Sequence, residues 1–296
     1  MTHMSLGITA TNLRLDYGDT RALDDLSFDL DGGKIYGLLG RNGSGKTSLL
    51  SIIAAFRQQT GGHITVDGRA PFENAAVTSQ ICLIRESGDV FDTASVNSAL
   101  KFAADFRPYW DADLAARLID RFEVPLKKRV QALSRGKRSA LGVILGLASR
   151  APVTLFDEVH LGMDAPSRYA FYEELLNDYL EHPRTVVLST HLIEEVASLF
   201  EEVIIIDRGR LILHEPADEV RDRGVAITGR TDAVENFTRD MEVLSTKQLG
   251  GTSQATVYGA LSDENRRAAV ESGLELGPVP LQDLFVHLTD VKRGNR

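Results

Sequence analysis

The chain has little cysteine, no long apolar segment and no excess of basic residues. Its 296 residues include a single cysteine, Cys82, which excludes an intrachain disulfide and suits a reducing compartment. The formal net charge is −9, so broad nucleic-acid binding is not expected and no nucleic-acid partner is predicted. Internal repeats and low-complexity tracts are also absent from the sequence, which favours an ordinary globular protein.

No segment is long enough to cross a bilayer as a helix. The best candidate, residues 140–148, lies between Arg138 and Arg150 and is far shorter than the roughly 20 residues that a spanning helix needs. The N-terminal residues show neither the basic region nor the apolar core of a secretory signal. We therefore expect that this chain would serve a membrane process only through another chain.

The most informative motif is G-x-x-x-x-G-K-[ST] at residues 40–47. A buried strand is expected at residues 35–39 and a helix at 48–56, so backbone N–H groups and a helix N-terminus would face phosphate oxygens. Lys46 would place a charge on the β- and γ-phosphates, and the Thr47 hydroxyl would ligate Mg²⁺. The residues assigned to nucleotide binding here are Gly40, Arg41, Asn42, Gly43, Ser44, Gly45, Lys46, Thr47 and Ser48.

Two carboxylates follow an apolar strand expected at residues 153–156. Asp157 would hold Mg²⁺ together with Thr47, and Glu158 would orient and deprotonate an attacking water. The plainer alternative is an ordinary strand end with two solvated acids. The phosphate-binding motif upstream favours the pair as the second half of an ATPase site.

The segment L-S-R-G-K at residues 133–137 precedes these carboxylates by about twenty residues. Here the chain resembles the ATP-binding cassette (ABC) transporter ATPases, over roughly residues 8–215. Three of its five residues match the family signature L-S-G-G-Q. The resemblance implies that Ser134 and Gly136 grip the γ-phosphate of an ATP held by an opposing subunit, whereas Arg135 departs from the family's glycine.

The same resemblance implies roles for further residues. Residues 162–164 look like the family's D-loop, His191 stands where its switch histidine holds the γ-phosphate and the water, and Tyr17 stands where an aromatic ring covers adenine. Glu86 occupies the position of a usual glutamine and is expected to ligate Mg²⁺. Val159 and His160 stand where proline and threonine, or a similar pair, are common, a change expected to be mild. Lys46, Glu158 and His191 are thus the catalytic candidates.

The fold class expected is α/β, a P-loop NTPase core of the ABC ATPase type with an antiparallel β subdomain and a helical insert. The ATPase domain would span residues 1–215, with the helical insert at about 86–145. Residues 216–296 read as a small α+β accessory domain, in the order βαββαβ with a trailing helix.

The resemblance implies an ATP-hydrolysing subunit that dimerises, with itself or a paralogue, around two ATP and Mg²⁺. Such a subunit drives a separate integral membrane chain. Residues 106–111 and 188–195 look like the branch of bacterial exporters in which the ATPase and membrane subunits are separate chains, a branch that includes antibiotic- and peptide-export cassettes. It would be cytoplasmic, on the inner face of the cell membrane. The alternatives are an ABC ATPase that does mechanical work on a non-membrane partner and a non-catalytic ATP switch. A GTPase fits poorly because it leaves residues 133–137 without a role.

Overall fold

The computed structural model describes residues 5–86, 90–259 and 261–294, with side chains described up to residue 290. The chain divides into two compact units, one of residues 1–191 with 204–214 and the other of 192–203 with 215–296. None of the helices in the described ranges is long and apolar enough to cross a membrane.

The first unit is built on a six-stranded sheet in the order β5-β6-β7-β3-β8-β9. The strands β5, β6, β7 and β3 pair in parallel. Every residue of β3, β6 and β7 is buried, which explains why these strands are continuous apolar runs rather than alternating ones. The strands are β3 (Ile35–Leu39), β5 (Ile81–Arg85), β6 (Val153–Asp157), β7 (Thr185–Thr190), β8 (Glu202–Asp207) and β9 (Arg210–Pro216).

This strand order brings the predicted site residues together at one edge of the sheet. The parallel strands β6, β7 and β3 are neighbours, so the residues that follow their carboxyl ends meet there. Those residues are the phosphate loop after Leu39, the carboxylate pair that begins at Asp157, and His191 after Thr190.

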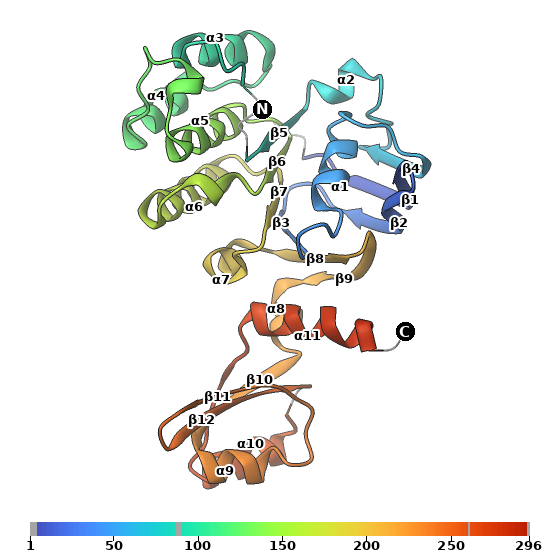
Figure 1. The fold of residues 1–296 in the computed structure, drawn as a ribbon, viewed down its shortest axis with the longest axis vertical. Coiled ribbons are helices and arrows are strands. Elements are labelled where there is room, and N and C mark those ends of the chain that lie inside the picture. The colour runs from blue at the N-terminus through green and yellow to red at the C-terminus, as the bar shows by residue number, and fades with distance from the viewer. Residues whose placement is uncertain (1–4, 87–89, 260, 295–296) are drawn as a thin grey trace. The chain divides into compact units, whose positions relative to one another are not determined.

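A second sheet of three antiparallel strands packs on helix α1 (Lys46–Ile53). It consists of β1 (Ile8–Tyr17), β2 (Thr20–Leu30) and β4 (Gly61–Val66). As its alternating pattern predicts, β2 buries Leu26, Phe28 and Leu30, and these join one core with Leu49 and Leu50 of α1. Figure 1 shows this sheet beside α1 and apart from the helical region.

The helical region is the part predicted as an insert, except that residues 87–89 lie outside the described residues. Asp111 caps α4 by accepting a hydrogen bond of 2.7 Å from the Leu114 N–H, and Ser134 caps α5 by accepting one of 3.3 Å from the Lys137 N–H. The helices of the first unit beyond α1 are α2 (Ala75–Thr78), α3 (Val96–Phe106), α4 (Ala112–Arg121), η1 (Val130–Ala132), α5 (Arg135–Ala148), η2 (Val159–Gly162) and α6 (Ala165–Glu181).

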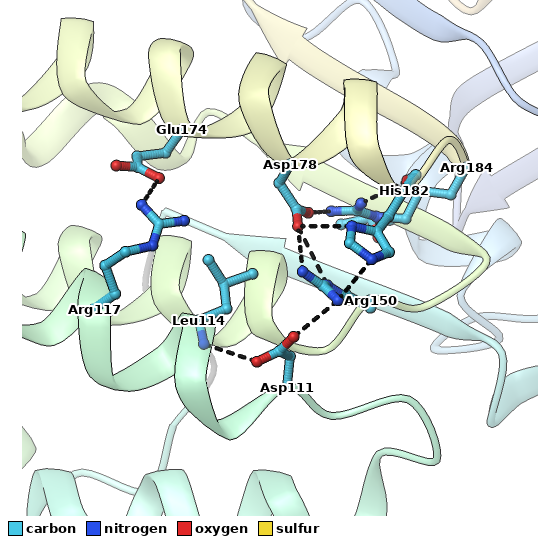
Figure 2. A network of polar contacts seen from close by, with 9 residues as sticks. Asp111, Leu114, Arg117, Arg150, Glu174, Asp178, His182 and Arg184 are labelled. Carbon is cyan, nitrogen blue, oxygen red and sulfur yellow. Dashed lines mark hydrogen bonds and ion pairs between the residues drawn. The ribbon is translucent and has the colours of Figure 1, made fainter.

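Buried ion pairs fasten α4 and the end of α5 to α6 (Figure 2). Asp178 of α6 is 4% exposed and receives Arg150 at 3.1 Å and Arg184 at 2.7 Å. Arg150 also reaches the α4 cap, Asp111, at 2.8 Å. Glu174, one turn earlier, receives Arg121 of α4 at 2.9 Å. Because removing one partner of a buried pair leaves the other charge uncompensated, this network fixes the helices to one another.

The second unit contains a four-stranded antiparallel sheet in the order β11-β12-β10-β13. This is the ferredoxin-like order, in agreement with the predicted βαββαβ module. Helices α9 and α10 share a core with one face of the sheet, and α11 lies along the other (Figure 1). Its elements are α7 (Ile193–Val196), η3 (Ala197–Leu199), α8 (Ala217–Arg221), β10 (Gly224–Arg230), α9 (Thr231–Phe237), β11 (Val243–Leu249), β12 (Thr252–Tyr258), α10 (Asp263–Glu271), β13 (Glu275–Pro278) and α11 (Leu281–Gly294).

One predicted helix end in this unit is wrong. The composition of residues 232–241 predicts a helix through Met241, but α9 ends at Phe237. The Thr238 hydroxyl donates a hydrogen bond of 2.9 Å to the Val234 carbonyl, and the backbone of Thr238 has already left helical geometry. The Thr238 N–H donates to the same carbonyl at 3.0 Å, so the hydroxyl adds a second contact at the residue where the helix ends.

Candidate nucleotide-binding and catalytic site

The loop between β3 and α1 encloses a pocket of about 400 Å³. Residues 42–48 line it, together with Glu158. The pocket therefore brings most of the predicted phosphate-binding residues together with the predicted base. Among the described residues, its lining does not include Tyr17, Glu86 or Ser134.

Close backbone packing explains two glycines of this loop. A β-carbon on Gly40 would lie 2.2 Å from Ser44 Oγ and 2.6 Å from the Ile206 carbonyl oxygen. A β-carbon on Gly45 would lie 2.7 Å from the Ala22 carbonyl oxygen, and Gly45 has a φ of 109° that L-residues rarely adopt. The loop can hold its shape only with glycine at these two positions.

The two polar side chains after the glycines are already oriented. Lys46 is buried, and its ammonium donates a hydrogen bond of 2.7 Å to the Gly40 carbonyl. The Thr47 hydroxyl donates one of 2.6 Å to Asp157 Oδ2. This contact joins residues 110 positions apart and confirms that the loop and the end of β6 meet.

Glu158 lies at the centre of the site in a strained conformation. Its φ is 53°, in the left-handed region that non-glycine residues seldom occupy, and such strain gathers at functional positions. Its Oε1 lies 3.5 Å from the Lys46 ammonium, and its Oε2 lies 2.9 Å from His191 Nδ1. The three residues predicted to act in catalysis are therefore in contact through one carboxylate.

Several buried polar atoms near the loop have no hydrogen-bond partner among the described residues. They are Ser44 Oγ, Asp157 Oδ1 and Ser189 Oγ. An unsatisfied polar atom in a buried site costs free energy unless a water, ion or ligand supplies the missing contact. Oxygen atoms from Thr47 and Asp157 are the ligand type that Mg²⁺ prefers. The donor set therefore fits the predicted phosphate and magnesium chemistry.

The signature segment is built differently, with its polar groups facing outward. Ser134 is exposed at the N-terminus of α5. A β-carbon on Gly136 would lie 3.0 Å from the Gly162 carbonyl oxygen, so α5 packs closely on the predicted D-loop. Asp164, which ends that loop, caps α6, and hydrogen bonds from Ser167 hold the pKa of its carboxyl below the ordinary value.

Tyr17 lies at the end of β1 and is 39% exposed. The Arg57 guanidinium lies over its ring at 5.1 Å, and its hydroxyl is 3.4 Å from Ser48 Oγ, at the end of the phosphate loop. One face of the ring is thus taken by a cation, and the contact with Ser48 brings the ring near the predicted nucleotide site. Its role as an adenine platform stays a prediction.

Two of the departures from the family pattern, Glu86 and Arg135, contact each other. The Arg135 guanidinium forms an ion pair with the Glu86 carboxylate, although the residues are 49 positions apart. Glu86 follows β5, whose last residue, Arg85, pairs with Asp157. The glutamate that replaces the usual glutamine is thus neutralised by the arginine that replaces the usual glycine.

His160 is the site residue whose importance the sequence did not predict. It is completely buried, its Nε2 lies 3.7 Å from Glu158 Oε2, and the same nitrogen lies 3.1 Å from the Thr190 hydroxyl. The only signal in the sequence was a histidine two residues after the predicted base.

A strand, a glycine loop and a helix that together cradle phosphate, beside a strand that ends in two carboxylates, define a P-loop nucleoside triphosphatase. Comparison with known proteins narrows this class. The family model for the ABC transporter domain matches residues 23–160. The ATP-binding protein YtrB of Bacillus subtilis is 26% identical over 272 residues, which cover 92% of this chain and 91% of YtrB.

Other relatives agree. The doxorubicin resistance ATP-binding protein DrrA of Mycobacterium tuberculosis is 29% identical, over 75% of this chain and 70% of DrrA. A solved ATP-binding subunit of an ABC transporter superposes with a TM-score of 0.65 at 21% identity, over 72% of this chain and 91% of that one. The chain thus matches the ABC transporter family over residues 23–160 and is similar to ATP-binding proteins of ABC transporters, and it is an ATPase.

Proposed function

We propose that this chain is the ATP-hydrolysing subunit of an ABC transporter, in which two such subunits close around two ATP molecules and drive a separate membrane chain, for export. The observation that carries the proposal is the position of the Glu158 carboxylate, between the Lys46 ammonium and the His191 ring and beside the phosphate loop. A carboxylate held in this way is suited to accept a proton from an attacking water.

Each residue has a distinct task in this mechanism. Lys46 and the N–H groups of residues 40–48 hold the β- and γ-phosphates. Glu158 orients the attacking water and takes its proton. His191, which is 43% exposed on its side chain and lies within 2.9 Å of Glu158, holds the γ-phosphate and keeps the carboxylate in place. Tyr17 stacks on adenine.

Thr47 and Asp157 would hold Mg²⁺ in the proposed site. The Thr47 hydroxyl donates a hydrogen bond of 2.6 Å to Asp157 Oδ2, and Asp157 Oδ1 has no hydrogen-bond partner among the described residues. When bound, Mg²⁺ would neutralise charge on the phosphates. Glu86 could add a ligand only after releasing Arg135, so we place it outside the resting magnesium site.

The exposed position of the signature segment, residues 133–137, favours a partner chain. Ser134 is exposed on α5 and does not line the phosphate pocket of its own chain. A helix N-terminus capped by serine favours anions, and Gly136 allows the backbone to approach them. We propose that Ser134 and Gly136 grip the ATP of a partner cassette, either a copy of this chain or a paralogue. The solved cassette MJ0796, which superposes with a TM-score of 0.63 at 18% identity over 71% of this chain and 98% of that one, is a dimer bound to ADP and phosphate.

A groove between α2, β5 and α3 offers a docking site for a membrane partner. Its volume is about 550 Å³, and its lining includes the exposed rings of Phe56, Phe91, Phe102 and Phe106. Clustered exposed aromatic rings mark interaction sites. We propose that a cytoplasmic segment of the membrane chain docks here, which places this subunit on the inner face of the membrane.

The test is to purify the tagged protein from detergent-solubilised membranes and from the cytosol of its host, and to identify partners by mass spectrometry. A stoichiometric chain with several membrane spans supports the proposal, and F102S and F106S should reduce its recovery while ATP binding persists. The exposed ring of Tyr169, on α6, provides the matched control Y169S. A soluble partner alone would instead favour an ABC ATPase that works on a non-membrane assembly.

A further inference from the structure

Three side chains of different elements converge beside the phosphate loop. They are Glu158, His160 of η2, and His191 after β7. One ligand atom from each lies within 4.8 Å of the other two. The shorter separations are 2.9 Å between Glu158 Oε2 and His191 Nδ1, and 3.7 Å between Glu158 Oε2 and His160 Nε2. A carboxylate oxygen and two imidazole nitrogens thus surround one point.

The ligand atoms of Glu158, His160 and His191 are of the types that bind a transition metal. Two imidazoles and one carboxylate, with a further position open, form a common Zn²⁺ donor set. Ligand bonds of about 2.0–2.2 Å in a tetrahedral site put the ligand atoms roughly 3.3–3.6 Å apart. The observed 2.9 and 3.7 Å bracket that range, so modest side-chain movement would complete the geometry.

The same set discriminates against Mg²⁺, which prefers oxygen ligands in octahedral arrangement. The oxygen pair proposed for Mg²⁺, Thr47 and Asp157, is a different group of atoms. The two sites therefore differ in ligand type as well as in residues, and Zn²⁺ and Mg²⁺ need not compete for the same atoms.

The surroundings make this site accessible and adjustable. His160 is completely buried and fixed beside the Thr190 hydroxyl, whereas the His191 side chain is 43% exposed, so an ion can enter from its side. The Lys46 ammonium approaches Glu158 through the other oxygen, Oε1, at 3.5 Å, which leaves Oε2 for a metal. Lys46 also repels a cation, which keeps the affinity moderate and binding reversible.

We propose that Glu158, His160 and His191 form a site for a divalent transition metal of the Zn²⁺ class, and that its occupancy stops ATP hydrolysis. The inhibitory part rests on the proposed function. A metal bound to Glu158 Oε2 and His191 Nδ1 withdraws the proposed base and its partner from the attacking water. The binding part rests only on the geometry of the three side chains.

Binding is tested with Co²⁺ on the nucleotide-free full chain. Tetrahedral Co²⁺ has strong visible d–d absorption, and we expect one equivalent to bind and to be displaced by Zn²⁺. H160Q and the exposed-site variant H191N should each weaken Co²⁺ binding at least about tenfold, as the loss of a metal-site residue does. His63, exposed on β4, provides the matched control, H63Q, which should bind as the wild type does.

Inhibition is tested separately at constant Mg²⁺ and ATP. We expect Zn²⁺ to lower the hydrolysis rate of the wild-type chain, a chelator to restore it, and H160Q to need at least about tenfold more Zn²⁺ for half-inhibition. Absence of the Co²⁺ spectrum in the wild type, or an equal spectrum in H160Q and H191N, overturns the metal site while leaving the proposed function intact. Co²⁺ binding in a chain that does not hydrolyse ATP retains the metal site and overturns the proposed function with its inhibition.

Discussion

The phosphate-loop half and the signature half of the proposed ATP site are built in opposite ways. In the first, Lys46 and Asp157 are buried and already have partners within the chain. In the second, Ser134 and Arg135 are exposed, and Arg135 is held by Glu86. One half is complete before nucleotide arrives, whereas the other presents its donors outward. The proposed function explains this difference, because one chain would bind ATP and the signature of a second chain would close on it.

The first half also keeps the family pattern, whereas the second departs from it. Gly40 and Gly45 of the phosphate loop are held by close packing that admits no side chain. At the signature, arginine replaces glycine and its charge is compensated by Glu86, 49 residues away. An exposed position can accept a new charge when a neighbour neutralises it, which a buried loop cannot do.

The largest expected effect comes from removing the proposed base. Glu158→Gln should keep ATP binding and lower hydrolysis by about 10²–10⁴-fold, because general-base help is lost. Light scattering with ATP should then show an accumulated dimer. Glu264→Gln, at an exposed position of α10, is the matched control. Near-normal turnover of Glu158→Gln would remove Glu158 from the mechanism.

A smaller effect is expected from a change at Ser134, in the signature half of the proposed ATP site. Ser134→Glu places a carboxylate where the partner's phosphate would lie, so hydrolysis should fall at least about tenfold while a single chain still binds ATP. Fluorescent-nucleotide titration and steady-state rates measure the two separately. Ser262, which caps α10 in the second unit, provides the control Ser262→Glu. Equal losses in both variants would point to helix destabilisation instead.

The ion pair between the two departures gives a weaker test. An exposed pair contributes at most about 1 kcal/mol, so its removal should change rates no more than about fivefold. Glu86→Gln removes a carboxylate as well as the pair, whereas Arg135→Gln removes only the pair. If Glu86 reaches Mg²⁺ during turnover, the two variants should shift the midpoint of the Mg²⁺ titration in opposite directions, because Glu86→Gln removes the carboxylate and Arg135→Gln releases it. Identical titrations of all three proteins would exclude Glu86 from the metal site.

The smallest effect is expected from a change at Asp24, on β2. A hydrogen bond from Arg210 holds the pKa of the Asp24 carboxyl below its ordinary value. A depressed folded-state pKa stabilises the protein above the unfolded value, near about 3.9, and this contribution is lost as pH falls through the folded value. The wild type should therefore melt higher than Asp24→Asn at neutral pH, and thermal scans should converge below about pH 4. A difference that does not depend on pH would show that the charge is not the cause.

The sequence predicted the parts of this molecule that local patterns encode. The phosphate loop, its flanking strand and helix, and the carboxylate pair after β6 are all recognisable within a short stretch. The order of the second unit was also predictable, because its strands alternate with polar-faced helices. The early end of α9 was not, because composition does not mark Thr238 as the residue at which the backbone leaves helical geometry.

The remaining features depend on contacts between distant segments. The pairing of Glu86 with Arg135 and the approach of His160 to Glu158 and His191 arise only when β5, β6 and β7 align in one sheet. A histidine beside a predicted base was expected to be a mild replacement, because the sequence alone does not show what surrounds it. The register of β6 and β7 brings Thr190 and His191 beside His160 and the proposed base.

The central claim, that each ATP site uses the phosphate loop of one chain and the signature of another, is tested most directly by mixing two inactive variants. Lys46→Ala disables the phosphate loop, and Ser134→Glu disables the signature. In a mixed dimer one site carries both defects and the other carries none. We expect the mixture to hydrolyse ATP at a measurable fraction of the wild-type rate, well above the rate of either variant alone. A mixture as inactive as its components would contradict a site shared between two chains.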